Sequence, residues 1–244
     1  MQILYHDEHL IAVNKPTGLL VHRSAIDRHE TRFALQLVRD RIGRRVYPLH
    51  RLDKPTSGVL LFALNEATAR LMMPVFSGGG VDKHYLAVVR GYTADRETID
   101  YPLKEQLDRM TDARADADKP AQAAITHLRR LATIELSQAV GRYHTARYSL
   151  VKLTPGTGRK HQLRRHMKHI FHPIIGDTSH GDGLHNRFFR DAFDCRRLLL
   201  AATQLSFVHP QSGQRISIEA PLDDTFTTIL DRLGWGDESG LSAE

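Results

Sequence analysis

The chain contains apolar segments of two kinds, some with the spacing of strands and others with the spacing of helices. Short apolar or alternating runs, bounded by turn residues such as those at 16–18 and 155–158, are typical of strands. The segments that this pattern predicts as strands are 9–15, 59–64, 84–90, 125–136 and 145–153. Residues 198–202 and 204–208 are predicted to be two further buried segments.

Three segments have apolar residues at helical spacing. Residues 31–43 predict a helix with Thr31 as its cap and a glycine at its end. Residues 65–80 predict a second helix, which begins at Asn65 and stops at glycines, and residues 163–170 predict a third. Because strands outnumber helices and no regular strand–helix–strand alternation is present, the pattern predicts an α+β fold.

The length of the chain suits one substantial core, since it has 244 residues and 41% of them are hydrophobic. We expect a single domain over residues 1–236, a flexible tail over 237–244, and an exposed polar insertion over 104–119. No apolar run approaches the roughly 20 residues of a membrane span. The single Cys195 fits a reducing compartment. We therefore expect a cytoplasmic protein without a signal peptide, acting as a monomer with no obligate protein partner.

Basic residues exceed acidic residues by 34 to 28, which gives a formal net charge of +6. Basic proteins bind nucleic acids because each neutralised phosphate releases a condensed counterion. A mildly basic protein without such a partner explains the net charge alone almost equally well. The basic residues are concentrated in the segments 39–45 and 159–168, however, and this clustering favours a polyanionic partner.

Six histidines between residues 161 and 185 raise the question of a metal site. Their spacing does not match the HExxH pattern, and no CxxC pair accompanies them. The glycine-containing segment at 155–158 does not match a phosphate-binding P-loop either. We therefore predict no metal ion and no cofactor.

The segment most indicative of chemistry is HRLDKPTSG at 50–58, which leads into the predicted strand at 59–64. Asp53 lies between Arg51 and Lys54, and these cations would stabilise its negative charge. Arg51 and Asp53 are two residues apart, so in an extended segment their side chains point to the same face. The alternative is that Asp53 is only a turn residue that accepts backbone N–H bonds.

Several segments together resemble the RluA family of pseudouridine synthases. HRLDKPTSGVLLFALN at 50–65 resembles the catalytic-loop motif of that family. The other matching segments are LIAVNKPTGLLVHRS at 10–24 for the opening strand and turn, KHYLAVVRG at 83–91 for the tyrosine-bearing strand, GRKHQLRRH at 158–166 for the third motif, and PIIGD at 173–177. The likeness extends in the same order over residues 2–235.

The resemblance implies a fold and an activity. The implied fold is a central mixed, mostly antiparallel sheet, flanked by helices and loops around an RNA-binding cleft, without a separate N-terminal RNA-binding domain. The implied activity is the isomerisation of uridine to pseudouridine, which needs no cofactor. The stretch at 158–177 is similar to a subgroup that modifies uridine 65 of transfer RNA. Ribosomal RNA is the alternative substrate, and a non-catalytic RNA-binding module is the alternative function.

The resemblance also implies roles for single residues. Asp53 would be the essential carboxylate, which attacks the base or the sugar or takes the 2′ proton of the sugar. Arg164 would pair with this carboxylate, and Tyr85 would stack on the flipped uracil. Arg51 would fill the place of the departed base, and Leu163 would pack beside the base. The residues expected to contact RNA in addition are His50, Arg159, Lys160, Arg165 and Lys168.

Three of these assignments have simpler alternatives. Tyr85 and Leu163 are also typical of ordinary core positions in a strand and a helix. Arg164 is also compatible with a phosphate contact or with a solvated charge on the helix surface.

Overall fold

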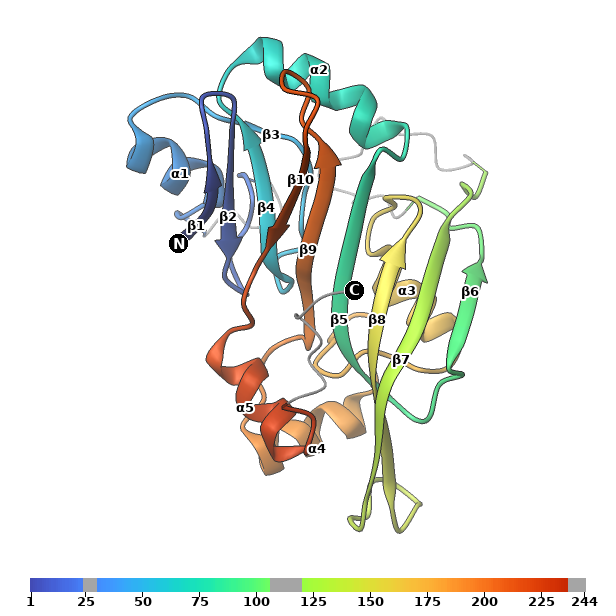
Figure 1. Ribbon diagram of the computed structural model, residues 1–244. Coiled ribbons are helices and arrows are strands. Elements are labelled where there is room, and N and C mark those ends of the chain that lie inside the picture. Colours follow the sequence, from blue (N-terminus) through green and yellow to red (C-terminus); the bar gives the residue numbers. More distant parts are fainter. Residues whose placement is uncertain (24–29, 106–119, 237–244) are drawn as a thin grey trace.

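A computed structural model describes residues 1–23, 30–105 and 120–236 (Figure 1). The tail predicted over 237–244 and nearly all of the insertion predicted over 104–119 lie outside the described residues. Within the described residues, no helix has both the length and the apolar composition needed to cross a lipid bilayer.

The described strands form one mixed sheet in the order β1-β2-β4-β9-β5-β8-β7-β6, in which β10 also pairs with β9 and β3 with β4. Their bounds are β1 Gln2–His6, β2 Leu10–Lys15, β3 Tyr47–Pro48, β4 Ser57–Ala63, β5 Val81–Arg90, β6 Arg96–Asp100, β7 Ile125–Leu136, β8 Ala146–Pro155, β9 Leu200–Val208 and β10 Arg215–Glu219. Only β4 and β9 pair in parallel, and the other described pairs are antiparallel. The predicted α+β class and the mostly antiparallel sheet are confirmed.

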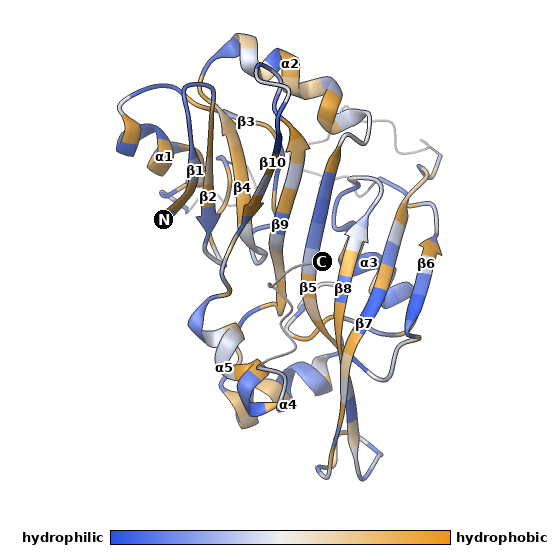
Figure 2. Ribbon diagram, viewed as in Figure 1, coloured by the Kyte–Doolittle hydropathy of each residue, from blue (hydrophilic) through white to orange (hydrophobic). Residues whose placement is uncertain are grey.

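The helices are α1 Ala34–Ile42, α2 Glu66–Ser77, α3 Gln162–His169, α4 Gly183–Phe193 and α5 Asp224–Arg232. In Figure 1, α3 lies behind β8 and β7, while α4 and α5 lie together at the lower end of the sheet. All seven residues of β4 are buried, and Figure 2 shows the apolar character of this strand. The centre of the sheet is therefore the rigid base on which the loops are placed.

Two apolar clusters on one face of the sheet meet at Tyr85. One packs α1 against β2 and β4, and the other packs α3 against β5, β7 and β8. Tyr85 contacts both clusters from β5. The opposite face of β5 and β8 contacts α4 and α5 near the lower end of the sheet. Tyr85 therefore lies where the apolar cluster under α1 meets the apolar cluster under α3.

The three predicted helices are present, but the first of them begins later than expected. Asn65 caps α2 as expected, because its side chain accepts a hydrogen bond from Thr68 N at 2.8 Å. The first helix begins at Ala34 after Phe33 rather than after Thr31. Its first N–H groups donate to the backbone carbonyls of residues 20 and 21 instead of to a side-chain cap.

The two buried segments predicted over 198–202 and 204–208 are mostly one strand, β9. The interruption at Thr203 is a bulge, where the register with β5 shifts between His84 and Tyr85. The Thr203 hydroxyl donates to His84 O at 3.2 Å, so the polar residue is satisfied without ending the strand. The elements β1, β3, β6, β10, α4 and α5 were not predicted from the pattern.

Candidate active site

Asp53 lies in the loop between β3 and β4, and the chain enters β4 through a glycine that no other residue can replace. Gly58 has a φ of +113°, and a Cβ there would lie 2.0 Å from Ala202 O. At this point β4 pairs in parallel with β9. The loop that carries Asp53 is therefore anchored directly against the centre of the sheet.

Lys15 ties this loop to the preceding turn. Its fully buried ammonium donates to Pro16 O at 3.0 Å, to Leu19 O at 2.7 Å and to Lys54 O at 3.2 Å. Burial lowers the pKa of Lys15 to about 7, although the nearby Asp53 carboxylate opposes this shift. No role was predicted for Lys15 from the sequence, although a lysine inside an apolar strand is a recognisable signal.

Arg164 of α3 connects two carboxylates. Its Nε and one terminal nitrogen donate to the two oxygens of Asp177 at 2.7 and 2.8 Å. Its other terminal nitrogen lies 3.1 Å from Asp53 Oδ2. The exposed side-chain fractions are 5% for Arg164, 1% for Asp177 and 27% for Asp53, so only Asp53 faces the solvent. The bidentate pair with Asp177 fixes the guanidinium plane and leaves one nitrogen directed at Asp53.

Asp177 is itself held by backbone donors. The N–H groups of Ser179 and His180 both donate to Asp177 Oδ1 at 2.9 Å. Burial raises the pKa of a carboxyl group, but here the Arg164 guanidinium and these N–H groups outweigh it and lower the pKa of Asp177. Asn186 of α4 accepts from Gly176 N and donates to Asp177 O, both at 2.8 Å. Asp177 lies in the segment 173–177 that resembles the family, but neither Asp177 nor Asn186 was given a role from the sequence.

Tyr85 projects from β5 toward the same site. The residue is half-buried, and its side chain packs against the clusters that contain Leu52 and Leu163. Burial and the neighbouring Asp53 carboxylate both raise the pKa of Tyr85, so the phenol stays protonated. The structure therefore brings together Asp53, Tyr85 and Arg164, the three residues predicted to be catalytic.

His161 also lies beside Asp53, although it was considered from the sequence only as one of six histidines of a possible metal site. Its backbone adopts a left-handed conformation with a φ of 54°, just before α3 begins. Its Nε2 lies 3.9 Å from Asp53 Oδ2, and its Nδ1 lies 3.0 Å from His180 Nε2. Burial lowers the pKa of His161, and Asp53 partly opposes this shift. This environment favours the uncharged form of the imidazole next to the carboxylate.

Two buried polar side chains hold α3 in place. Gln162 donates to Ile125 O at 2.9 Å and accepts from Arg159 N at 3.0 Å. His166 contacts the Thr126 hydroxyl and Tyr101 O, both at 3.0 Å. Because both side chains anchor α3 to β7, the helix carries Arg164 on a fixed support.

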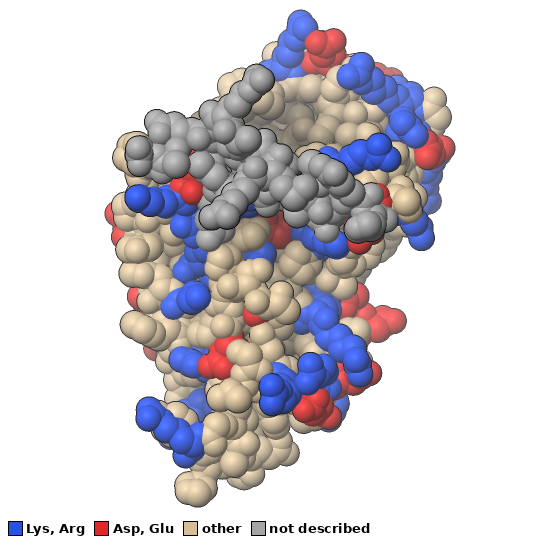
Figure 3. Space-filling view, turned by 180° about the vertical axis from the view of Figure 1, so that it is seen from behind, with Lys and Arg blue, Asp and Glu red and all other residues tan. Residues whose placement is uncertain are grey.

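The other predicted site residues occupy two kinds of position. Arg51, Arg159, Lys160 and Lys168 are exposed, Arg165 is half-buried, and Leu163 lies in the core beside Tyr85. Figure 3 shows Lys and Arg side chains spread over the face of the molecule that is turned away from the viewer in Figure 1. These positions leave several of the cations accessible to a polyanion.

His50 lies in a different environment from the predicted RNA-binding residues. Its ring stacks on Phe76 at a centroid distance of 5.4 Å, and its Nε2 accepts from Leu61 N at 3.1 Å. Burial and the neighbouring Lys83 lower the pKa of His50 to about 3, so the ring is uncharged. This geometry supports a packing role rather than an RNA contact.

The cations that flank Asp53 in sequence are not its main partner in space. Lys54 pairs with Glu30 at 3.0 Å, and Arg51 is exposed. The charge that the sequence analysis expected from these two neighbours comes from Arg164, which lies 111 residues further along the chain.

The described residues contain no group of three or more His, Cys, Asp or Glu side chains placed to hold a metal ion. The side chains gathered at the site are the carboxylates of Asp53 and Asp177, the guanidinium of Arg164, the phenol of Tyr85 and the imidazole of His161.

The chain is similar to known proteins over nearly its whole length. Over its whole length the chain is 51% identical to tRNA pseudouridine synthase C of Vibrio cholerae, which is also covered completely. It is 54% identical to tRNA pseudouridine synthase C of Haemophilus influenzae, covering 96% of this chain and 98% of the relative. The solved structure of human RNA pseudouridylate synthase domain containing 4 superposes with a TM-score of 0.72 at 25% identity, covering 96% of this chain and 93% of that structure.

The family profile described as RNA pseudouridylate synthase matches residues 9–169. This match spans Asp53, Tyr85 and Arg164, and it confirms the family and the fold that the sequence motifs predicted. The chain belongs to the RNA pseudouridylate synthase family.

Proposed function

We propose that this protein converts uridine to pseudouridine in transfer RNA, at uridine 65, with Asp53 as the essential carboxylate. The observation that carries the proposal is the partly exposed Asp53 carboxylate, 3.1 Å from a buried Arg164 and next to Tyr85. The transfer RNA substrate is supported by relatives named tRNA pseudouridine synthase C at 51% and 54% identity.

The reaction exchanges one bond for another within a single nucleotide. The bond from the sugar carbon C1′ to N1 of uracil breaks, a bond from C1′ to C5 forms, the C5 proton leaves, and N1 gains a proton. Asp53 has three available roles: attack on the base, attack on the sugar, or removal of the 2′ proton. Each role requires a carboxylate close to the sugar, and the guanidinium of Arg164 holds Asp53 in one orientation without blocking its solvent-facing side.

The target base must leave its stack before it can reach Asp53. Unstacking costs a few kcal/mol, and a flat aromatic ring offsets part of that cost. In our proposal the ring of Tyr85 receives the uracil and allows it to turn, while Leu163 packs beside it. Arg51, exposed in the loop that carries Asp53, occupies the space that the base leaves in the RNA.

The basic residues around α3 provide the contacts to the RNA backbone in this proposal. Arg159 and Lys160 lie just before α3 and are exposed, Lys168 on the helix is also exposed, and Arg165 on the helix is half-buried. Cations on an accessible helix neutralise phosphates and release counterions, which makes the binding dependent on salt. We also propose that residues 1–236 act as one catalytic domain, in the cytoplasm and as a monomer.

The test of the proposal is tritium release from transfer RNA labelled at C5 of uridine. The wild type should release tritium, whereas Asp53→Ala and Asp53→Asn should release none while still binding the RNA. Asp191→Asn, which alters an exposed acid on α4 with a side-chain exposure of 63%, is the matched control and should behave like the wild type. Full activity of Asp53→Asn would contradict the assignment of the catalytic carboxylate.

The substrate is tested separately by mapping pseudouridines in total RNA from cells with and without the gene. Loss of one signal at position 65 of transfer RNA is expected. Loss of a signal in ribosomal RNA with transfer RNA unchanged would support the alternative substrate. No loss anywhere, together with RNA binding, would support a non-catalytic RNA-binding module.

A further inference from the structure

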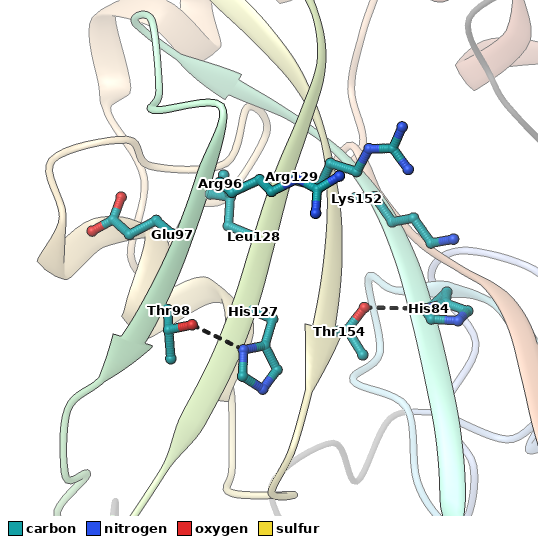
Figure 4. Close-up of a pocket in the computed structure, with 9 residues that line it drawn as sticks. All are labelled: His84, Arg96, Glu97, Thr98, His127, Leu128, Arg129, Lys152 and Thr154. Carbon is teal, nitrogen blue, oxygen red and sulfur yellow. Dashed lines mark hydrogen bonds between the residues drawn. The ribbon is translucent and has the colours of Figure 1, made fainter.

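A row of three cations crosses the sheet on the face opposite Tyr85. Arg96 of β6 pairs with Arg129 of β7, and Arg129 pairs with Lys152 of β8. Side chains alternate between the two faces of a strand, so all three point away from Leu153, which pairs with Tyr85 on the side of α3. Figure 4 shows the three side chains next to one another across these strands.

The three cations lack acidic partners among the described residues. None of them makes an ion pair or a hydrogen bond through its side chain in that part of the chain. The carboxylate of Glu97, which also lines this surface, points away from the row in Figure 4. Like charges directly opposite one another on neighbouring strands destabilise a sheet. The three like charges therefore lower the stability of the sheet. By contrast, Arg215 of β10 and Asp82 of β5 form an ion pair of opposite charges.

A second row of hydrogen-bonding side chains lies beside the cations. Thr98 contacts His127 Nδ1 at 3.0 Å, and Thr154 contacts His84 Nδ1 at 3.0 Å. These contacts leave Nε2 of both imidazoles without a partner in the described residues. Together the two rows line an open hollow of about 500 Å³, which no described helix covers (Figure 4).

We propose that this surface binds the sugar–phosphate backbone of the substrate RNA at a place distant from the target uridine. The inference rests on the proposed function, because it assigns a second contact to the same substrate. Neighbouring strands are about 4.8 Å apart, so the row presents three single charges over about 10 Å. A strand of regularly spaced phosphates complements such a row, and the histidine and threonine side chains supply further hydrogen-bonding groups.

The position of the cations favours a large folded RNA, such as the transfer RNA of the proposed function, as the ligand. Asp53 and the cations lie on opposite faces of one sheet, and β6 is its last strand, so a large folded RNA can pass around that edge. A short hairpin that only fills the active site is too small to reach both faces. The contact should therefore matter for a full-length transfer RNA and not for a short hairpin.

The experiment compares the triple variant Arg96→Gln/Arg129→Gln/Lys152→Gln with the control Arg70→Gln/Arg190→Gln/Arg196→Gln. The control removes the same charge from exposed arginines that pair with neighbouring acids. Dissociation constants are measured as a function of salt for full-length transfer RNA and for a hairpin that contains the target uridine. Circular dichroism verifies that both variants are folded.

The triple variant should bind full-length transfer RNA about tenfold or more weakly, and its salt slope should fall by about 2. Its affinity and activity on the hairpin should equal those of the control. Unchanged binding of full-length transfer RNA would overturn the proposal, and so would an equal loss on the hairpin. Wild-type activity on the hairpin tests the proposed function independently, so failure of one proposal can be told from failure of the other.

Discussion

The two faces of the strands β5, β8, β7 and β6 hold their cations in opposite ways. On the face with Tyr85, the guanidinium of Arg164 is buried, bonded twice to Asp177 and once to Asp53. On the other face, Arg129 is exposed between two further cations and has no acidic partner among the described residues. An arginine side chain is therefore held in a fixed geometry on one face, whereas on the other face its charge remains available to a ligand.

This difference follows from solvation. A buried cation loses its hydration and is tolerated only when acids and hydrogen bonds replace the water. An exposed cation keeps its water and its counterions, so the absence of an acid costs little until other cations lie close to it. A paired buried arginine thus indicates that geometry is required, whereas unpaired exposed cations indicate a surface that can bind a polyanion.

The largest effect should come from changing the geometry at Arg164 while keeping its charge. Arg164→Lys replaces a planar fork by a point charge, which cannot bond both oxygens of Asp177 and still reach Asp53. We expect the catalytic rate constant to fall by about 10²-fold or more, because misplacing a catalytic group by 1 Å has effects of that size. Single-turnover kinetics with the RNA hairpin that contains the target uridine measure this rate constant.

The matched control for this prediction is Arg190→Lys, which makes the same replacement at an exposed arginine of α4. Its rate should equal the wild-type rate. If Arg164→Lys also retained the wild-type rate, the charge of Arg164 alone would be sufficient, and the contrast between the two faces would not depend on geometry.

A second effect, on stability rather than on rate, is expected when the acid behind Arg164 loses its charge. The pKa of Asp177 is lowered in the folded protein, so its carboxylate contributes stability that is fully present above the unfolded pKa of about 3.9 and is lost as pH falls through the folded pKa. Asp177→Asn should therefore reduce the free energy of unfolding at pH 7 by about 3 kcal/mol. The difference from the wild type should shrink below about pH 4.

Urea denaturation at several pH values measures this difference. Asp191→Asn removes an exposed, paired acid and should change the stability by less than about 1 kcal/mol at any pH. A loss in Asp177→Asn that stays constant down to pH 3 would show that shape rather than charge is what Asp177 contributes.

Local signals in the sequence predicted the catalytic residues better than the residues that hold them in place. Asp53, Tyr85 and Arg164 were identified from motifs in which several unusual residues stand close together in the chain. The roles of Lys15 and Asp177 depend on contacts with residues outside their own sequence segments, such as the carbonyl of Lys54 or the N–H of Ser179. A sequence shows that a buried charge needs a partner, but it does not show which partner the fold supplies.

Some of the missed elements have a recognisable pattern and others do not. In α4, Leu184 and Phe188 stand four residues apart next to Phe189, so its apolar face was present in the sequence but was not interpreted as a helix. β10 has only five residues, and just Ile218 is buried. β9 appeared as two segments because the bulge at Thr203 interrupts the alternation. The cation row also escaped notice, since its three members come from three strands and meet only through their register.

The smallest effect should come from reversing one charge in that row. Lys152→Glu places a carboxylate directly opposite Arg129, so a repulsive cross-strand pair becomes an attractive one. We expect the midpoint of urea denaturation to rise, by an amount equivalent to about 0.5 kcal/mol, while the affinity for full-length transfer RNA falls. The neutral variant Lys152→Gln is the control and should lie between the wild type and Lys152→Glu in both measurements. Opposite signs for stability and affinity would separate a binding surface from an ordinary solvated face, for which RNA affinity would not change. A loss of stability in Lys152→Glu would instead mean that the three cations do not repel one another in the folded protein, and the argument that the row is kept for a ligand would no longer hold.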